Sequence, residues 1–372
     1  MKRLTTLFFM AFVLVFSTAR AERYYYFTHI QTTDGLPSNT IHGVHQDKSG
    51  FIWIGTRDGL CRYDGKEFQR LSDITPAHNM NSATFDITED LSGRIWFSST
   101  SGIGYYDPYT DQAGMLDALK ESFARYIQAD SKGNVWIVSD NLFRYDTSNS
   151  GLHTYTFPET GPMMVTEDRM GNVWILMKDG TVHGYDRLTD EFSQKPIDEK
   201  LKIIESTYNN NLLAATTDDR VILIDCLTFS SKEIFRSDEK KEIRCLKEGN
   251  KGEFWIGTDL GLFIRREHET YSGEAYHNDA TPSSISADLI TSIDRDHSGN
   301  IWIGTYYTGL NICKNKAEEM SLYLRNPSAN SIKGKVVRKI CPDNTGKIWF
   351  CTEDGWLSNL DPKAQKANNY EI

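Results

Sequence analysis

Apolar and polar residues form blocks that return along the chain about every 40 residues. In the clearest copy, an apolar block at residues 51–56 is bounded by polar turns at residues 47–50 and 57–59. The block begins with Phe-Ile-Trp-Ile, so both faces of an extended strand there would be apolar. A strand with two apolar faces lies between other layers of a structure. The pattern therefore predicts a buried β-strand that recurs along the chain.

Each copy of the repeat predicts four short strands. In the first copy these are residues 41–46, 51–56, 60–63 and 68–71, separated by turns that contain Asp and Gly. Glycine supplies the positive φ that such tight turns require. Four strands in each repeat of about 40 to 45 residues predict an all-β fold, a β-propeller with four-stranded blades.

Eight copies of the repeat are found, spaced 38 to 47 residues apart. The copy at residues 209–221 is degenerate and lacks both Gly and Trp, and the third copy has Asn141 where others have the Gly of the second turn. The recurrence favours a structural role for the repeated residues, with the tryptophans packed between adjacent blades and the glycines in the turns. These residues are Trp53, Trp96, Trp136, Trp174, Trp255, Trp302 and Trp349, and Gly50, Gly93, Gly133, Gly171, Gly252, Gly299 and Gly346.

The N-terminal part of the chain suggests how the ring closes. Residues 24–30 resemble a fourth strand followed by the connection into the next blade, as do residues 320–331. A ring can close when such an N-terminal strand pairs with the last blade and becomes its fourth strand. We therefore expect a seven-bladed propeller at residues 22–330, with the eighth repeat, residues 331–372, as the first blade of a second propeller in a longer protein. An eight-bladed ring closed by the same strand is the alternative.

Residues 1–21 have the pattern of an export signal. Lys2 and Arg3 precede an apolar run at residues 4–16, and Ala19 and Ala21 fit the small-x-small cleavage pattern. The run is shorter than the roughly 20 residues that span a bilayer. We therefore predict a periplasmic protein, and the net charge of −10 argues against binding of nucleic acid by this chain.

The six cysteines form no Cys-x-x-Cys motif. Cys61 and Cys313 fall on predicted third strands, where other copies have apolar residues or glycine, which indicates buried filler. Cys341 and Cys351 could face each other across a hairpin, so a disulfide between them stays open.

The sequence contains no recognised catalytic or cofactor motif. His42 and His45 are three positions apart on a strand and would point to opposite faces, so they cannot chelate one metal from that strand. Asp294, Asp296 and Ser298 imitate the start of a calcium loop, but the twelfth position is Thr305 instead of Glu. We expect no enzyme activity of this chain, no cofactor and no metal.

Ligands of propellers usually gather on one face near the axis. That face would carry the turns between the second and third strands, together with the links into the next blade at residues 76–82, 281–287 and 326–335. Aromatic and planar polar side chains there suit the binding of sugars. The candidate ligand-binding residues are Arg57, Asp58, Asp259, Tyr306 and Tyr307.

The phrase Asp-x-x-Gly-x-[Ile/Val]-Trp-Ile-Gly-Thr-x-x-Gly-Leu, followed by Tyr-Asp as at residues 63–64 and 106–107, resembles the two-component regulator propeller repeat. The resemblance covers about residues 23–361. It implies the periplasmic sensor part of a hybrid two-component system of the kind common in gut Bacteroidetes. In that family a signal peptide, two seven-bladed propellers and a β-sandwich precede a membrane helix, a histidine kinase, a receiver and a DNA-binding domain.

The resemblance also implies a function. Members of the family sense oligosaccharides and switch on genes for polysaccharide utilisation. The implied parent sensor is a homodimer that reaches the membrane only through a helix downstream of this chain. Two other functions stay open from the sequence. One is an exported propeller enzyme, a lyase or a glycoside hydrolase-like protein, that acts on polysaccharide. The other is a propeller that binds a protein.

Overall fold

The structure is a computed structural model that describes residues 25–75, 80–120, 122–237, 241–267, 273–279, 281–314, 332–361 and 366–372. The predicted export segment, residues 1–21, lies outside the described residues. The chain divides into two compact units, Met1–Asn315 and Lys316–Ile372, which are described separately.

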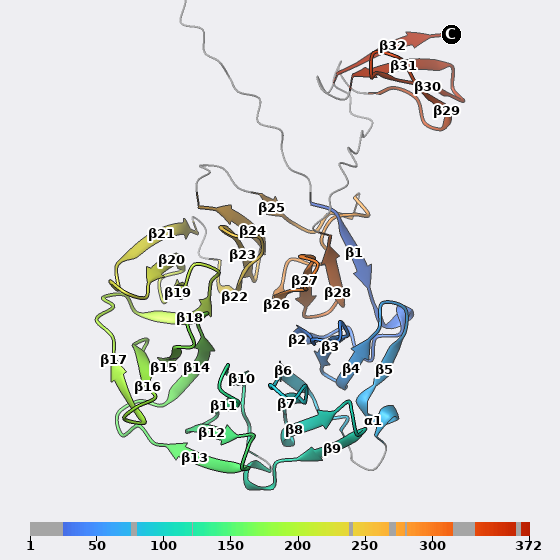
Figure 1. The fold of residues 1–372 in the computed structure, drawn as a ribbon. Coiled ribbons are helices and arrows are strands. Elements are labelled where there is room, and N and C mark those ends of the chain that lie inside the picture. The colour runs from blue at the N-terminus through green and yellow to red at the C-terminus, as the bar shows by residue number, and fades with distance from the viewer. Residues whose placement is uncertain are drawn as a thin grey trace, which may run out of the picture. The chain divides into compact units, whose positions relative to one another are not determined.

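The described part of the first unit consists of four-stranded antiparallel sheets, as the repeat predicts (Figure 1). The first three sheets are β2 (Ile41–Gln46), β3 (Ile52–Thr56), β4 (Gly59–Tyr63) and β5 (Phe68–Arg70); β6 (Thr84–Glu89), β7 (Ile95–Ser99), β8 (Gly102–Asp107) and β9 (Gln112–Met115); and β10 (Tyr126–Ala129), β11 (Asn134–Val138), β12 (Leu142–Asp146) and β13 (Gly151–Tyr155). A short helix, α1 (Leu71–Ile74), and two 3-10 turns, η1 (Thr32–Asp34) and η2 (Asp117–Leu119), lie in the connections.

The next three sheets follow the same order. They are β14 (Pro162–Glu167), β15 (Val173–Met177), β16 (Val182–Asp186) and β17 (Glu191–Gln194); β18 (Leu201–Ser206), β19 (Asn211–Thr216), β20 (Arg220–Asp225) and β21 (Ser231–Arg236); and β22 (Ile243–Glu248), β23 (Glu253–Thr258), β24 (Gly261–Arg266) and β25 (Glu274–Ala275).

A strand from the N-terminal part of the chain completes the seventh sheet. This sheet contains β26 (Ile290–Arg295), β27 (Ile301–Thr305), β28 (Leu310–Cys313) and β1 (Phe27–Ile30). Antiparallel pairing places Phe27 opposite Cys313 and Ile30 opposite Leu310. The prediction that the N-terminal strand completes the last blade is therefore confirmed.

Within the described residues 25–314, seven sheets are arranged around an axis (Figure 1). The first strand of each sheet is innermost, and each innermost strand packs against that of the next sheet until β26 meets β2. The second unit contains one further sheet, β29 (Val337–Pro342), β30 (Ile348–Thr352), β31 (Trp356–Asp361) and β32 (Lys366–Glu371). Its assignment to a second propeller stays a prediction, as do the boundaries near residues 22 and 330.

The Asp and Trp of the repeat are joined by a hydrogen bond. In six copies the indole Nε1 donates to an Asp Oδ2 six residues earlier at 2.7 to 3.0 Å, in the pairs Trp53–Asp47, Trp96–Asp90, Trp136–Asp130, Trp174–Asp168, Trp302–Asp296 and Trp349–Asp343. The other carboxylate oxygen accepts a backbone N–H across the turn, for example that of Arg94 on Asp90 at 3.0 Å. One carboxylate therefore stabilises both the turn and the orientation of the indole.

Two copies replace this pair. In the sixth copy Trp255 Nε1 donates instead to Glu253 Oε1 at 2.9 Å, from the same strand. In the degenerate fifth copy Thr207 occupies the Asp position, Asn210 takes the glycine-like φ of 59°, and the buried Leu213 occupies the Trp position. The fifth blade keeps its strands because Asn tolerates the left-handed conformation and a hydroxyl can accept the turn N–H.

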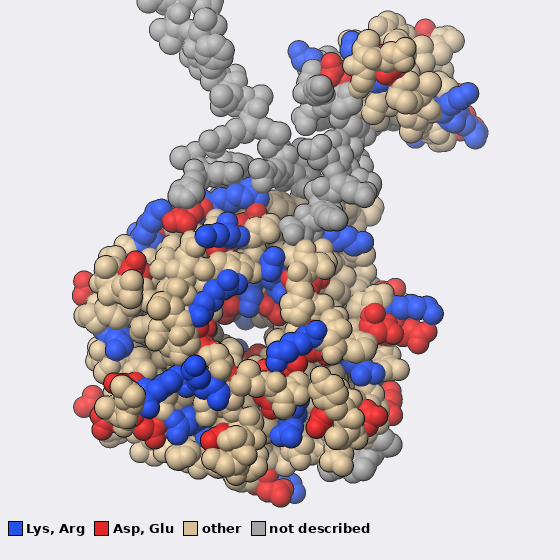
Figure 2. Space-filling view, in the orientation of Figure 1, with Lys and Arg blue, Asp and Glu red and all other residues tan. Residues whose placement is uncertain are grey.

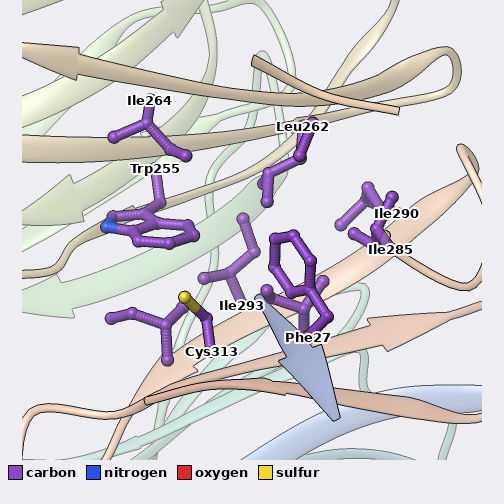
Figure 3. Packing of buried hydrophobic residues seen from close by; sticks show 11 residues of the cluster. Phe27, Trp255, Leu262, Ile264, Ile285, Ile290, Ile293 and Cys313 are labelled. Atoms are coloured by element: carbon purple, nitrogen blue, oxygen red, sulfur yellow. The ribbon is translucent and has the colours of Figure 1, made fainter. Parts of the chain in front are cut away.

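The tryptophans of the ring pack against the following sheet. Trp53 lies in one apolar cluster with Ile87, Phe97 and Tyr106 of the second sheet. At the closure, Trp255 of the sixth sheet packs with residues of the seventh sheet and with Phe27 of β1 (Figure 3). Phe27 is only 5% exposed in this cluster, so burial of its apolar ring stabilises the strand pairing that closes the ring of blades.

The cysteines of the ring behave as the sequence suggests. Cys61 and Cys313 are buried, and Cys313 belongs to the closure cluster. In the second unit Cys341 lies opposite Trp349 and Cys351 lies opposite Lys339. Because this register offsets the two cysteines, they do not face each other, and both are free.

Removal of one turn carboxylate tests the Asp–Trp bond. Asp90→Ala leaves the buried indole N–H of Trp96 without an acceptor, and we expect a loss of about 2–3 kcal/mol in the free energy of unfolding. Denaturant unfolding measures this loss. Asp107→Ala, which removes hydrogen bonds only from the outer-turn N–H groups of Tyr109 and Thr110, serves as the control. Equal losses in the two variants would contradict the structural role of the bond.

Truncation of Phe27 tests the ring closure. We expect Phe27→Ala to lose about 3–5 kcal/mol in the free energy of unfolding, because it opens a cavity in the closure cluster. Leu188, which is 97% exposed, provides the control, and Leu188→Ala should stay within about 0.5 kcal/mol of wild type. A Phe27 variant as stable as the Leu188 variant would show that β1 does not hold the ring.

Candidate functional site

The turns between second and third strands lie on the same face as the entrances to the innermost strands. The backbone N–H of Arg57 donates to the carbonyl of Thr40 at 3.1 Å, and that of Asp259 donates to Glu242 at 3.2 Å. Tyr306 makes the equivalent bond to Leu289 at 3.4 Å. We name this the turn face, defined by the β3–β4, β23–β24 and β27–β28 turns and their equivalents.

The structure brings the five predicted ligand-binding residues to the turn face of three consecutive sheets. Asp259 lies on the sixth sheet, Tyr306 and Tyr307 on the seventh, and Arg57 and Asp58 on the first, which follows the seventh around the ring. The two tyrosine rings are 4.5 Å apart with an interplanar angle of 87°. They are 40% and 71% exposed, so their faces are available to a ligand.

The remaining predicted residues differ in what they contact. The carboxylate of Asp259 accepts the backbone N–H of Glu242 at 2.8 Å, so it also fixes the entrance to β22. Arg57 and Asp58 are exposed, and within the part of the chain that the structure describes neither side chain has an ion-pair partner. Of the predicted links, residues 281–287 are described, whereas residues 76–79 and 326–331 lie outside the described residues.

An aromatic cluster that the sequence analysis missed lies where the first innermost strands begin. The ring of His42 lies 4.9 Å from that of Phe85, and Phe85 lies 5.1 Å from Phe123. Burial, and then the nearby charge of Arg125, lower the pKa of His42. His42 and Phe85 are the second residues of consecutive innermost strands, and Phe123 precedes the third such strand; sequence alone could not place them side by side.

Charged residues of three sheets meet near the axis. Lys247 on β22 places Nζ 2.7 Å from Glu205 Oε1 on β18 and 3.0 Å from Asp294 Oδ1 on β26. Burial opposes the charge of Lys247, but the two carboxylates outweigh burial and raise its pKa. Figure 2 shows an opening at the centre of the ring with basic and acidic side chains around it. The ammonium group therefore links the sheets on either side of its own.

Two residues of the calcium-like triplet, Asp294 and Asp296, make structural contacts. Asp294 pairs with Lys247, whereas Asp296 accepts the indole N–H of Trp302 and two N–H groups of Asn300. Among the residues that the structure describes, no group of three or more His, Cys, Asp or Glu side chains is arranged to hold a metal ion.

Asp86 on β6 belongs to the same axial region. Burial is the main cause that raises its pKa to about 7, and the charges of Glu205 and Asp294 add to it. Backbone N–H groups of Ile127 and Ile87 donate to the carboxylate and act in the opposite direction. Asp86 is therefore protonated in an appreciable fraction of molecules near neutral pH.

Two stretches of the chain, residues 35–58 and 284–307, match the family model of the two component regulator propeller. A 36-residue segment is 47% identical to histidine kinase P4 of Formosa agariphila, and it covers 10% of this chain and 3% of that protein. The family model names the same repeat as the sequence analysis did.

Solved structures share the fold. The extracellular domain of a hybrid two component system from B. thetaiotaomicron matches with a TM-score of 0.70 and 19% identity, over 94% of this chain and 50% of that one. Virginiamycin B lyase from Staphylococcus aureus matches with a TM-score of 0.63 and 12% identity, over 78% of this chain and 99% of that one. This chain thus spans about half the length of the extracellular domain that it matches. The described residues include no helix with the length and apolar character needed to cross a membrane.

Stability as a function of pH tests the environment of Asp86. Because its pKa is higher in the folded state than the ordinary value of 3.8, its stabilising contribution is complete below that value and is lost as the pH rises through about 7. We expect wild type to lose stability relative to Asp86→Asn as the pH rises from about 4 to 7, by at most about 1.4 kcal/mol per pH unit, and the difference to change little above pH 7.

Thermal unfolding of both proteins across this range measures the difference. Asp73→Asn makes the same change at an exposed site and is the control, with a pH dependence expected to follow wild type. A constant difference between wild type and Asp86→Asn at all pH values would contradict the raised pKa.

Proposed function

We propose that this chain is the periplasmic ligand-sensing region of a hybrid two-component sensor, and that it signals the presence of oligosaccharides to control polysaccharide-utilisation genes. The match of two repeats to the two component regulator propeller model carries the proposal. The fold shared with extracellular domains of hybrid two component systems supports it. The predicted export segment at residues 1–21 is consistent with a periplasmic location.

The turn face is the proposed oligosaccharide site. The matched stretches end at Asp58 and Tyr307, and they lie on sheets that are neighbours across the ring closure. The turn face carries two exposed tyrosine rings on one sheet and a guanidinium and a carboxylate on the next sheet, which together offer apolar faces and planar hydrogen-bonding groups. This combination suits a sugar, whose ring offers C–H groups on its faces and hydroxyl groups at its edge.

The rest of the signalling pathway would belong to parts of the protein outside this chain. In this proposal the parent sensor is an inner-membrane homodimer, and a kinase, a receiver and a DNA-binding domain transmit the signal. The chain itself then needs no enzyme activity and no cofactor.

A second candidate function is an exported propeller enzyme that acts on polysaccharide. The likeness to virginiamycin B lyase and the carboxylates near the axis, Asp86, Glu205 and Asp294, favour this candidate. Incubation of the chain with polysaccharides separates the two functions, because an enzyme would release products whereas a sensor would bind fragments unchanged. A protein-binding propeller would do neither and would retain a protein partner in a pull-down.

Removal of the tyrosine pair tests the proposed function. Oligosaccharides from polysaccharide digests are screened for those that raise the melting temperature of the chain, and binding is then measured by calorimetry. We expect Tyr306→Ala combined with Tyr307→Ala to weaken binding about tenfold or more, because two aromatic contacts are lost.

Tyr109→Ala is the matched control, because Tyr109 is 79% exposed but lies in the outer turn between β8 and β9. Its affinity should equal that of wild type. If no digest shifts the melting temperature, or if the double variant binds as wild type does, the turn face is not the sensing site.

A further inference from the structure

A basic hollow lies on the face of the ring opposite the turn face. It has a volume of about 290 Å³ and is lined by Arg169, Tyr208, Asn250, Lys251 and Arg295. We name this set the basic hollow. Four of its residues belong to turns between first and second strands, and Arg295 is the last residue of β26. Since the innermost strands begin at the turn face, their ends lie at the other face.

The basic hollow is built by four consecutive sheets close to the axis. Arg169, Tyr208 and Lys251 follow the innermost strands β14, β18 and β22, and Arg295 ends β26. Arg295 Nη1 donates to Tyr208 Oη at 2.7 Å, although their sheets are separated by the sheet of β22. Such a contact is only possible on the axial side of the ring, so the hollow lies at the rim of the central opening.

Tyr208 holds two guanidinium groups close together. The guanidinium carbon of Arg169 lies 4.1 Å from the centre of its ring, and that of Arg295 lies 5.5 Å from the same centre. The backbone N–H of Tyr208 donates to Glu248 at the end of β22, which fixes the turn that carries the ring. The positions of both arginines are thus determined by one anchored aromatic side chain.

The basic hollow gathers three cations. Among the described residues, none of Arg169, Lys251 and Arg295 has a carboxylate within ion-pair distance, in a chain of net charge −10. Arg295 Nε is also buried without a hydrogen-bond partner. Gathering three cations without a counter-charge costs free energy, which a bound anion would offset.

The position of Arg295 differs from its equivalents in other sheets. In four of the six other sheets of the described ring the last residue of the innermost strand is Gln46, Glu89, Glu167 or Glu248, and its side chain accepts the N–H of the residue after the repeat Asp, or after its replacement Thr207, in the preceding sheet. The other two innermost strands end in Ala129 and Ser206. In β26 an arginine replaces this acceptor, so the repeat's own contact is absent where the cations gather. A guanidinium has no acceptor atom, so Arg295 cannot form this inter-blade hydrogen bond and instead adds a positive charge to the basic hollow.

We propose that the basic hollow binds an oxyanion group, a carboxylate, sulfate or phosphate. Arginine matches such groups because its planar N–H donors can form paired hydrogen bonds to two oxygens. Lys251 adds a point charge, and the hydroxyl hydrogen of Tyr208 is available because its oxygen accepts from Arg295. The group belongs to an acidic sugar or to a free inorganic ion. This site does not rest on the proposed oligosaccharide site at the turn face.

Calorimetric titration of the chain tests the proposal, with uronic acid disaccharides, sulfated disaccharides, sodium sulfate and sodium phosphate as probes, each at low and high salt. We expect at least one probe to bind, with an affinity that falls as salt rises. Arg169→Gln combined with Arg295→Gln should weaken that binding tenfold or more. Lys251→Gln changes an exposed side chain, so it provides a second variant if the double substitution unfolds the ring.

Lys66→Gln removes the same charge from an outer turn, where Lys66 is 86% exposed, and should bind as wild type does. Binding of acidic disaccharides without binding of the inorganic salts supports the sugar as the source, and the reverse supports a free ion. Absence of binding by every probe, or equal affinity of wild type and the variants, overturns the proposal. Because Tyr306→Ala and Tyr307→Ala leave the basic hollow intact, failure at one face is distinguishable from failure at the other.

Discussion

The buried hydrogen bond between a turn carboxylate and the indole N–H six residues later is the interaction on which the blades depend. It couples the tight turn after each innermost strand to the orientation of the tryptophan in the second strand. With its N–H satisfied, the indole can be buried against the next sheet without the cost of an unpaired polar group. A local turn motif therefore controls how neighbouring blades pack.

The two exceptions show which part of this arrangement is indispensable. In the sixth copy Glu253 provides the acceptor from within the strand, so the indole of Trp255 is still satisfied. In the fifth copy both partners are absent, and the apolar Leu213 fills the space without a polar group that needs an acceptor. Each copy thus either satisfies the buried N–H or removes it, because an indole without an acceptor would destabilise the blade.

Ring closure has consequences for chemistry as well as for stability. Once β1 joins β28, the innermost strands surround one axis, and side chains from distant repeats become neighbours. Lys247 then bridges Glu205 and Asp294, and Arg295 reaches Tyr208. The two faces of the ring differ as a result: exposed tyrosines lie on the turn face, and the cations of the basic hollow lie on the opposite one. The ring therefore has two chemically distinct surfaces.

The sequence by itself determined the four-stranded repeat, the turns, the burial of the tryptophans and the origin of the closing strand. These features depend on contacts within about 40 residues and on a pattern that recurs, so one copy explains the others. It also placed Tyr306, Tyr307, Arg57, Asp58 and Asp259 in turns that share a face. Only the tertiary structure decided that the Asp259 carboxylate accepts the N–H of Glu242 and that burial raises the pKa of Asp86. It also decided that Arg169 and Arg295 both pack on the ring of Tyr208. The reason is physical: the partners of these side chains come from other blades, so burial and charge around the axis are set by ring closure, which no single repeat encodes.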